Sequence, residues 1–143
     1  MTFTAEELSY LRSQPLARLA TVGPDGQPDV VPVGITLEGP YIYVAGLDNP
    51  RTRKYRNVRD SSSKVALVVD DLVSTAPWSP RFLRVYGTAD VVERDIGNGP
   101  QPLIRIAPTV SWSWNLEGRP FTHETDMSSI RLQRTVHEPP AEG

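Results

Sequence analysis

Apolar residues in this chain occur in short runs separated by glycine, proline, aspartate and asparagine. In several of these runs apolar and polar residues alternate, which is the period of a strand with one buried face. Gly23 to Gly26 and Gly39-Pro40 supply turn residues between successive runs. The pattern predicts strands over five segments, Ala17–Val22, Pro28–Leu37, Tyr41–Ala45, Lys64–Asp70 and Arg81–Val92.

Two of these predicted strands contain residues that interrupt regular pairing. Pro32 has no amide hydrogen to donate to a neighbouring strand, so the second strand should be irregular there. Gly87 marks a bulge or a close packing point in the last of the five. Between the strands that end at Asp70 and begin at Arg81, residues 71–80 are expected to form a loop that carries Trp78.

The remainder of the chain is less regular. Short strands are predicted over Leu103–Ile106 and Val110–Trp114, and a last strand over Ile130–Val136. Residues 115–127 show no clear period. A loose tail is expected over about residues 137–143.

Two short helices complete the prediction. Thr4 followed by Glu7 is a capping box, which predicts a helix over residues 5–13. Asn49 suits an N-cap and Pro50 the first helical position, which predicts a second helix up to Arg59. Six or seven strands with two short helices indicate a mainly β fold, a small barrel, in one domain that spans residues 1–143.

Composition narrows the classes of function. A net charge of -2, from 15 basic and 17 acidic residues, argues against a general nucleic-acid surface. The absence of cysteine rules out disulfides and thiol chemistry. No run has the length of a membrane span, and the first residues do not resemble a secretory signal, so we expect a cytoplasmic protein without membrane contact.

The segment from Asn49 to Asn57 carries the most distinctive chemistry. It places four cations, Arg51, Arg53, Lys54 and Arg56, at the start of a predicted helix that directly follows a predicted strand. A helix N-terminus beside cationic side chains binds phosphate. The alternative is a solvated basic helix face, which is what runs of charge usually are.

The order of four segments resembles the pyridoxamine 5'-phosphate oxidase-like split β-barrel family, and within it the branch that depends on the deazaflavin coenzyme F420. These segments are Arg18–Val22, Gly26–Val33, Arg53–Asn57 and Val65–Asp70. Each is short, so the resemblance depends on their order and spacing over residues 5–92. It implies a six- to seven-stranded split β-barrel and a homodimer with F420, or alternatively FMN, at the subunit interface.

The resemblance also implies roles for individual residues. The cofactor phosphate would contact Arg51, Arg53 and Lys54, and Asn57 would bond nearby or hold the helix start. The tricyclic ring would lie along the strand that contains Pro32, Val33, Gly34 and Thr36, and Gln27 would lie near the cofactor. A structural explanation remains possible for each set. Gly34 could be needed for a bend of the barrel, and Gln27 could be polar simply because it lies in a turn.

Aromatic residues are candidates for a substrate wall or a dimer interface. Trp78, in its proline-flanked segment, is the one most expected to face a substrate pocket, whereas core packing is the usual role of a tryptophan. For Arg81 and Arg84, a contact to the cofactor from the second subunit is one reading and a surface salt bridge is the favoured one.

Other kinds of chemistry find no support in the sequence. The two histidines, His123 and His137, lack a metal-ligand spacing, so no metal is expected. No G-x-S-x-G or G-x-G-x-x-G pattern occurs. No catalytic acid or base can be named.

The resemblance implies an F420-dependent oxidoreductase, and we expect it to transfer hydride from the reduced deazaflavin to an electron-poor double bond of a small organic substrate. A flavin-type cofactor carries the chemistry itself, so the lack of a general-base signature is no objection. Two alternatives stay open: an FMN-dependent oxidase or reductase of the same family, and a non-catalytic cofactor-binding protein.

Overall fold

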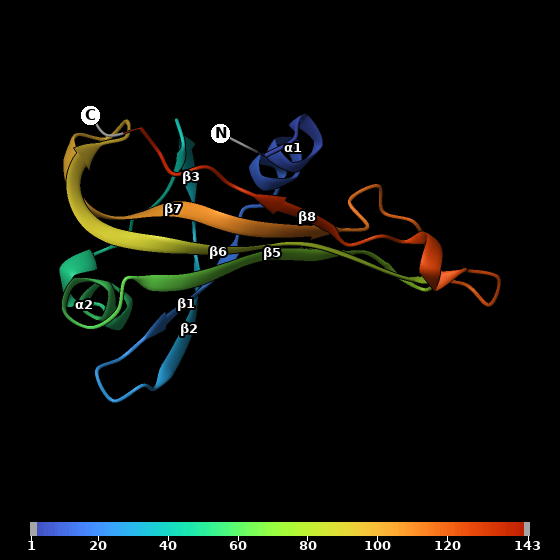
Figure 1. Cartoon of the computed structure of the whole chain (residues 1–143), viewed down its shortest axis with the longest axis horizontal. Coiled ribbons are helices and arrows are strands. Elements are labelled where there is room, and N and C mark those ends of the chain that lie inside the picture. Colours follow the sequence, from blue (N-terminus) through green and yellow to red (C-terminus); the bar gives the residue numbers. More distant parts are fainter. Residues whose placement is uncertain (1–2, 142–143) are drawn as a thin grey trace.

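The computed structural model describes residues 3–141 and shows a sheet with helices at its edges (Figure 1). The helices are α1 (Ala5–Ser13) and α2 (Arg53–Asp60), with short 3-10 turns at η1 (Asn49–Arg51) and η2 (Met127–Ser129). The strands are β1 (Ala17–Val22), β2 (Pro28–Val33), β3 (Thr36–Glu38), β4 (Tyr41–Val44), β5 (Lys64–Thr75), β6 (Trp78–Asp95), β7 (Pro100–Trp114) and β8 (Gln133–Val136).

All strand pairs belong to one antiparallel sheet in the order β2-β1-β5-β6-β7-β4-β3, with β8 added to β7. The edge of β7 that faces away from β6 is shared. Its residues 104–106 pair with β4, and its residues 110–113 pair with β8. Between these stretches, the His137 amide donates to the Thr109 carbonyl at 2.9 Å. The mainly β split barrel is confirmed, with eight strands where six or seven were expected.

The core lies inside the curved sheet. On β1, β5 and β6, alternate residues point inward, and the completely buried ones include Leu19, Leu67, Leu83 and Val85. Ile106 of β7 belongs to the same buried cluster. Burial of a side chain of this size contributes about 1.5–3 kcal/mol, so the inward face of these strands supplies the main driving force for folding.

The α1 helix is fixed by two sets of polar contacts. The predicted capping box is present, since the Glu7 amide donates to Thr4 Oγ1 at 3.1 Å and the Thr4 amide donates to Glu7 Oε1 at 2.9 Å. Tyr10 donates its hydroxyl to Asp71 Oδ1 at 2.8 Å, and Arg81 Nε donates to the same oxygen at 2.8 Å. Tyr10 therefore joins α1 to β5 and β6.

The start of α2 differs from the prediction. Asn49 does not cap this helix; Thr52 does, accepting the Tyr55 amide on its hydroxyl at 3.3 Å. Asn49 instead begins the 3-10 turn and is 1% exposed. Its side-chain amide nitrogen donates to the carbonyls of Val44 and Pro102, which gives both carbonyl groups a hydrogen-bond partner inside the protein.

Four strand predictions were wrong in their boundaries. The segment 28–37 is divided into β2 and β3 at Gly34-Ile35, whereas Pro32, where the irregularity was expected, pairs in register with Arg18. Residues 71–80 are mostly strand, because Leu72 pairs with Pro80 and β5 and β6 continue as a hairpin. The segments 103–106 and 110–114 form one strand, β7, because β6 pairs with it along its length. The last strand is shorter than predicted, since β8 begins at Gln133.

Gly87 lies at the bulge that was predicted for it. The register between β6 and β7 shifts between Tyr86 and Gly87, and Gly87 pairs with Pro108. A Cβ atom on Gly87 would lie 2.8 Å from the Ala107 carbonyl oxygen and 2.8 Å from Ile106 Cγ2. Only glycine allows the two strands to approach this closely, and the bulge absorbs the interruption that Pro108 causes in β7.

The expected tail begins beside the barrel. His137 is 7% exposed, and its Nε2 lies 2.8 Å from Ser111 Oγ. Residues 142 and 143 of the expected tail lie outside the described residues. Within residues 3–141, neither helix has the length and apolar character needed to cross a bilayer.

Replacing Gly87 by alanine should lower the free energy of unfolding by about 1–3 kcal/mol, because the new methyl group would overlap backbone atoms of β7. Gly34→Ala is the matched control, since its methyl group would meet no atom within 4 Å, and a change within about 0.5 kcal/mol is expected. Urea unfolding of both variants measures the difference. Equal midpoints for Gly87→Ala and the wild type would contradict the close approach.

Asp71→Asn should destabilise the fold by about 1–3 kcal/mol near neutral pH, because Arg81 loses a charged partner. The bond from Arg81 lowers the pKa of Asp71 in the folded state. The stabilisation by this pair is therefore complete above the unfolded-state pKa of about 4 and is lost as the pH falls through the lowered folded value. Urea unfolding from pH 7 to about pH 2 should show the variant and wild type converging; a constant difference would refute the assignment.

Candidate functional site

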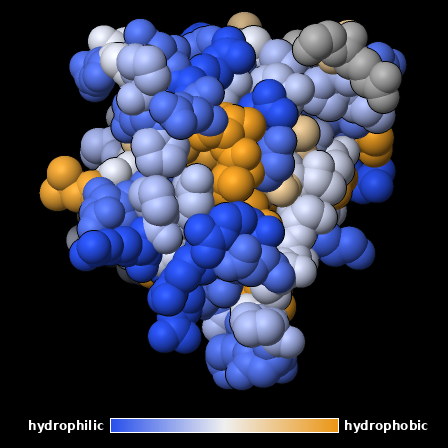
Figure 2. All heavy atoms as spheres, turned by 90° about the vertical axis from the view of Figure 1, so that its left-hand side faces the viewer, coloured by the Kyte–Doolittle hydropathy of each residue, from blue (hydrophilic) through white to orange (hydrophobic). Residues whose placement is uncertain are grey.

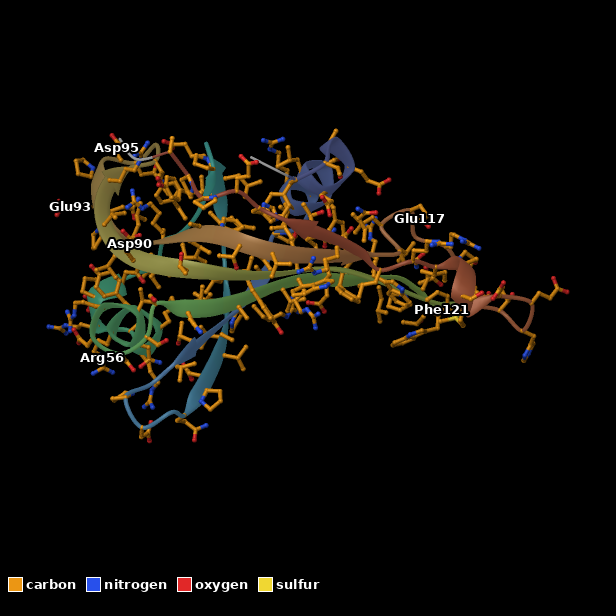
Figure 3. The ribbon with its side chains drawn as sticks, viewed as in Figure 1. Arg56, Asp90, Glu93, Asp95, Glu117 and Phe121 are labelled. Atoms are coloured by element: carbon orange, nitrogen blue, oxygen red, sulfur yellow. The ribbon has the colours of Figure 1, made fainter. Side chains whose placement is uncertain are left out.

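The four cationic side chains at the start of α2 do not form a single cluster. Arg51 reaches back to Asp48, with Nε 3.3 Å from the carboxylate, and both side chains are exposed. Arg53 and Arg56 line a shallow pocket of about 320 Å³ together with Pro24 and Asp60. Arg56 projects from α2 into solvent (Figure 3). The segment thus offers two separate cationic positions, the arginine pocket and Lys54.

Lys54 lies on the side of α2 that faces the end of β4. Its Nζ atom is 3.8 Å from the position that a Cβ atom of Gly46 would take. Among the described residues Lys54 forms no ion pair within 4 Å, although it is half-buried. Burial lowers the pKa of the Lys54 ammonium, and the nearby charge of Asp29 partly opposes this. Lys54 is therefore a partly desolvated cation that can receive an anion.

Asn57 connects α2 to the sheet. It is 5% exposed, its amide donates to Thr21 Oγ1 at 3.0 Å, and its backbone carbonyl accepts the amides of Ser61 and Ser62. These bonds hold α2 against β1 and close the C-terminal turn of the helix. The expected role of holding the helix start is not what these bonds do, since Thr52 caps that end; the other expected role, a bond near the cofactor phosphate, stays a prediction.

The β2–β3 segment is open to solvent where the ring of a cofactor was expected. Pro32, Gly34 and Thr36 are exposed, whereas Val33 is buried. A Cβ atom at Gly34 would meet no atom within 4 Å, and its φ lies outside the left-handed region. Neither packing nor backbone geometry within the chain requires glycine at this position. Gln27 is exposed, and its amide donates to the Pro28 carbonyl at 3.0 Å.

The end of the molecule that carries α2 combines polar and apolar surface. Figure 2 shows this end with an apolar area in its middle, surrounded by hydrophilic residues. Leu47 lies in the loop between β4 and η1, which leads into α2, and its side chain is 97% exposed. A ligand with an apolar ring and a charged group could use both kinds of surface.

The outer face of the sheet is apolar across several strands. Val30 is 64% and Tyr86 45% exposed, and a groove of about 560 Å³ is lined mainly by side chains of β1, β5 and β6, including Ala20, Val22 and Ala66. Exposed apolar surface of this extent marks a binding or association face.

A cation–aromatic cluster on this outer face was not predicted as a unit. The guanidinium of Arg84 lies 4.3 Å from the ring centre of Trp112 and 5.5 Å from that of Tyr86. Arg81 forms the expected salt bridge with Asp71, but Arg84 forms none within residues 3–141, and its Nε atom is buried without a partner. The sequence does contain a signal for this cluster: inward and outward side chains alternate along both strands, so pairing β6 with β7 would have predicted Arg84, Tyr86 and Trp112 on one face.

Trp78 lies far from the cations. It is 52% exposed at the β5–β6 hairpin, and its carbonyl accepts the amide of Phe121 at 2.8 Å. Figure 3 places Phe121 and Arg56 at opposite ends of the molecule. One copy of the chain therefore does not bring the expected substrate-pocket residue to the expected phosphate-binding residues.

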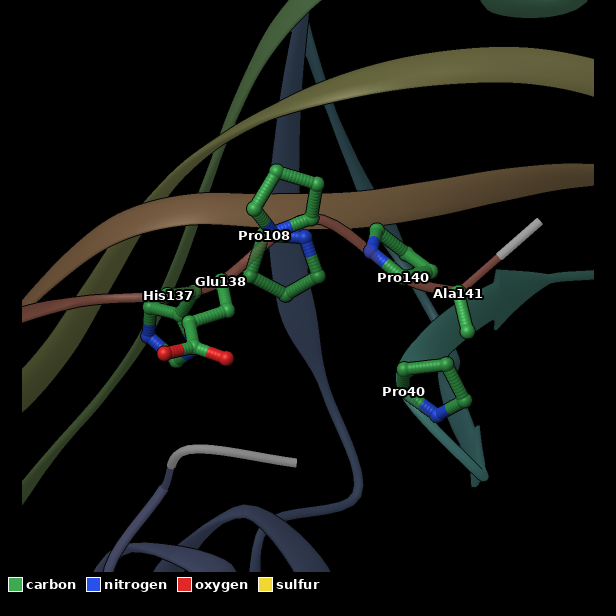
Figure 4. Close-up of a pocket in the computed structure, with 7 residues that line it drawn as sticks. Pro40, Pro108, His137, Glu138, Pro140 and Ala141 are labelled. Atoms are coloured by element: carbon green, nitrogen blue, oxygen red, sulfur yellow. The ribbon is translucent and has the colours of Figure 1, made fainter.

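A further cavity, of about 360 Å³, lies between the tail and the barrel (Figure 4). His137 and Glu138 lie at one end of it, and Pro40 and Ala141 at the other. Burial lowers the pKa of His137, whose bonded neighbour Ser111 is completely buried. A substrate cannot reach that hydroxyl, so the pair is structural. Residues 3–141 contain no group of side chains arranged to hold a metal ion.

Comparison with a curated protein places this geometry in a functional context. The chain is 39% identical over 125 residues to a 5a,11a-dehydrotetracycline/5a,11a-dehydrooxytetracycline reductase of Streptomyces rimosus. The alignment covers 82% of this chain and 87% of the reductase. The two proteins are therefore similar over most of their lengths.

Solved structures share the fold at lower sequence identity. A conserved hypothetical protein, Rv2991 of Mycobacterium tuberculosis, has a TM-score of 0.65 with 19% identity over 90% of this chain and 96% of its own. HupZ of Group A Streptococcus has a TM-score of 0.63 with 20% identity over 84% and 99%. An FAD-binding protein of Mycobacterium smegmatis has a TM-score of 0.56 with 20% identity over 78% and 93%.

A family model gives the assignment itself. The model described as pyridoxamine 5'-phosphate oxidase matches residues 3–111, which include every strand from β1 to β6 and the whole of α2. Together with the reductase relative, this match supports an oxidoreductase with the split-barrel fold. The chain belongs to the pyridoxamine 5'-phosphate oxidase family.

Proposed function

We propose that this protein is an F420-dependent reductase that adds hydrogen across an electron-poor double bond of a small organic substrate. The observation that carries the proposal is the similarity to the tetracycline-series reductase along most of both chains. The name of that relative describes reduction of a dehydro compound. The corresponding reaction delivers one hydride to one carbon of the double bond and one proton to the other, so the substrate gains two electrons and the cofactor loses two.

The residues at the α2 end fit a phosphorylated, flat cofactor. Lys54 supplies a partly desolvated ammonium, and Arg53 and Arg56 supply a second cationic position nearby on the same helix. The open backbone at Gly34 leaves room for a ring to lie against β2 and β3. When bound there, reduced F420 supplies the hydride.

The remaining tasks of the chain are orientation and exclusion of water. Phosphate contacts at Lys54 would fix one end of the cofactor, and the strand that contains Pro32 and Thr36 would fix the ring. In this proposal the proton comes from solvent.

A homodimer completes the proposal. The outer sheet face, with Val30 and Tyr86 exposed, is apolar enough for a second copy to bury. Trp78 and Lys54 lie at opposite ends of one chain, so a twofold arrangement is the direct way to bring an aromatic end to a cationic end. The cofactor would then lie between the two copies.

FMN is the alternative cofactor, since it shares the phosphate and the flat ring. The similarity in fold to an FAD-binding protein is compatible with it. A non-catalytic binding role is the second alternative, and one structural neighbour is named as the haem storage protein HutZ of Vibrio cholerae. The histidines argue against haem here, because His137 is buried against Ser111 and His123 lies exposed in the segment before η2.

Titration of the purified protein with F420 and with FMN, followed by turnover of reduced F420 with a panel of enones and quinones, tests the proposal. Binding of F420 and its oxidation in the presence of an acceptor are expected. Tight FMN binding with no response to F420 would support the first alternative. Binding of F420 without turnover of any acceptor would support the second.

Lys54→Ala should weaken binding of the phosphorylated cofactor by about 10- to 100-fold, which corresponds to the loss of one charge-assisted contact. Arg59→Ala is the matched control on the same helix, because Arg59 pairs with Asp60 and is away from Lys54. Fluorescence titration measures both dissociation constants. Equal affinities for the two variants would show that Lys54 does not contact the cofactor.

Val30→Glu should convert a dimer into monomers, since an ionised carboxylate would be buried on the outer sheet face. Arg12→Glu, at an exposed residue of α1, should leave the assembly unchanged. Native mass spectrometry gives the subunit number of each. A monomeric wild type at micromolar concentration, or a dimeric Val30→Glu variant, would contradict this face as the interface.

A further inference from the structure

The side chain of Asn49 is held in one orientation. Its Nδ2 atom donates to the Val44 carbonyl at 3.2 Å and to the Pro102 carbonyl at 3.1 Å. Rotating the amide by half a turn would place Oδ1 against two carbonyl oxygens, so the assignment of nitrogen and oxygen is fixed by these bonds. The Oδ1 atom must therefore point away from β4 and β7.

This fixed oxygen has no hydrogen-bond partner among the described residues. Asn49 is 1% exposed, and Oδ1 is buried from solvent. A buried acceptor without a donor is costly, and such groups in native proteins usually have a specific reason. A donor that is close but displaced in this state would provide that reason.

Lys54 is a hydrogen-bond donor that lies close to this oxygen without bonding to it. A Cβ atom on Gly46 would lie 3.4 Å from Asn49 Oδ1 and 3.8 Å from Lys54 Nζ. The oxygen and the ammonium therefore border the same small space, which exists because residue 46 has no side chain. Asp29, on β2, is the charged group that acts on Lys54 here, and Asp48 is engaged by Arg51.

We propose that Asn49 is a positioning residue for Lys54: its side-chain oxygen accepts one of the three ammonium hydrogens and directs the other two toward the cofactor phosphate. Lysine has a flexible stem and three donors, so an anchoring acceptor reduces the entropy lost when an anion binds. The glycine at position 46 keeps the space between the two groups free. This inference rests on the proposed function, because it requires an anion at Lys54.

The test compares 5-deazariboflavin with its 5'-phosphate, since the two compounds differ only in the phosphate. The ratio of their dissociation constants measures the contribution of the phosphate in each variant. Gly46→Val leaves the bonds from Asn49 Nδ2 intact but fills the space beside Oδ1, so the ratio should fall by about tenfold. Arg59→Ala, on α2 but paired with Asp60 and away from Lys54, is the control and should retain the wild-type ratio.

Asn49→Asp supplies a readout that a merely structural role would not change. A carboxylate beside Lys54 raises the pKa of the ammonium. The alkaline pH at which the phosphate preference disappears should therefore move upward by about one pH unit, while the preference at pH 7 falls because two anions are then close together. Thermal unfolding of each variant shows whether it is folded under the conditions of the titration.

The outcomes separate the inference from the proposed function. If the wild type binds neither compound, or binds both equally, the proposed phosphate site fails. If the wild type prefers the phosphate and Lys54→Ala removes the preference, the site stands. A preference that is then unchanged in Gly46→Val, with no shift of the alkaline limit in folded Asn49→Asp, overturns the role of Asn49.

Discussion

The pairing of β6 with β7 determines where the other elements of this protein lie. β5 extends the sheet from one side of this pair, and β4 and β8 both attach to the other. The close approach at Gly87 gives the pair its bulge, and Pro108 is accommodated opposite it. Because Asn49 bonds the end of β4 to the Pro102 carbonyl of β7, the position of α2 also depends on this pair.

The candidate site combines groups that the sheet keeps apart within one copy. Cations and an open strand edge occupy the end with α2, whereas Trp78 and Phe121 occupy the other. Between them lies an outer face of small apolar residues where the guanidinium of Arg84 rests on Trp112 and forms no ion pair with any described residue. In the proposed homodimer, the flat cofactor would lie between the cationic end of one copy and the aromatic end of the other. The same exposed surface would then serve both association and catalysis.

The features that could be predicted best from the sequence are those that depend on residues close together along the chain. The capping box of Thr4 and Glu7 and the bulge at Gly87 follow from local chemistry, and both are present. The choice between Asn49 and Thr52 as helix cap could not be made locally, because it was decided by two buried carbonyls, one of them on a distant strand. The continuity of β7 was missed for the same reason, since its pairing partner overrides the break at Pro108. The different directions of Arg51, Arg53 and Lys54 follow from three-dimensional surroundings that a linear cluster of charge does not reveal.

The shared edge of β7 has a consequence for the C-terminal segment. β4 and β8 leave a short interval between their pairings, and the amide of His137 reaches the Thr109 carbonyl there. His137 thus covers a carbonyl of β7 that would otherwise be free to accept a hydrogen bond from a strand of another molecule. The residue that follows β8 in this way extends the protection of the β7 edge beyond the paired strand itself.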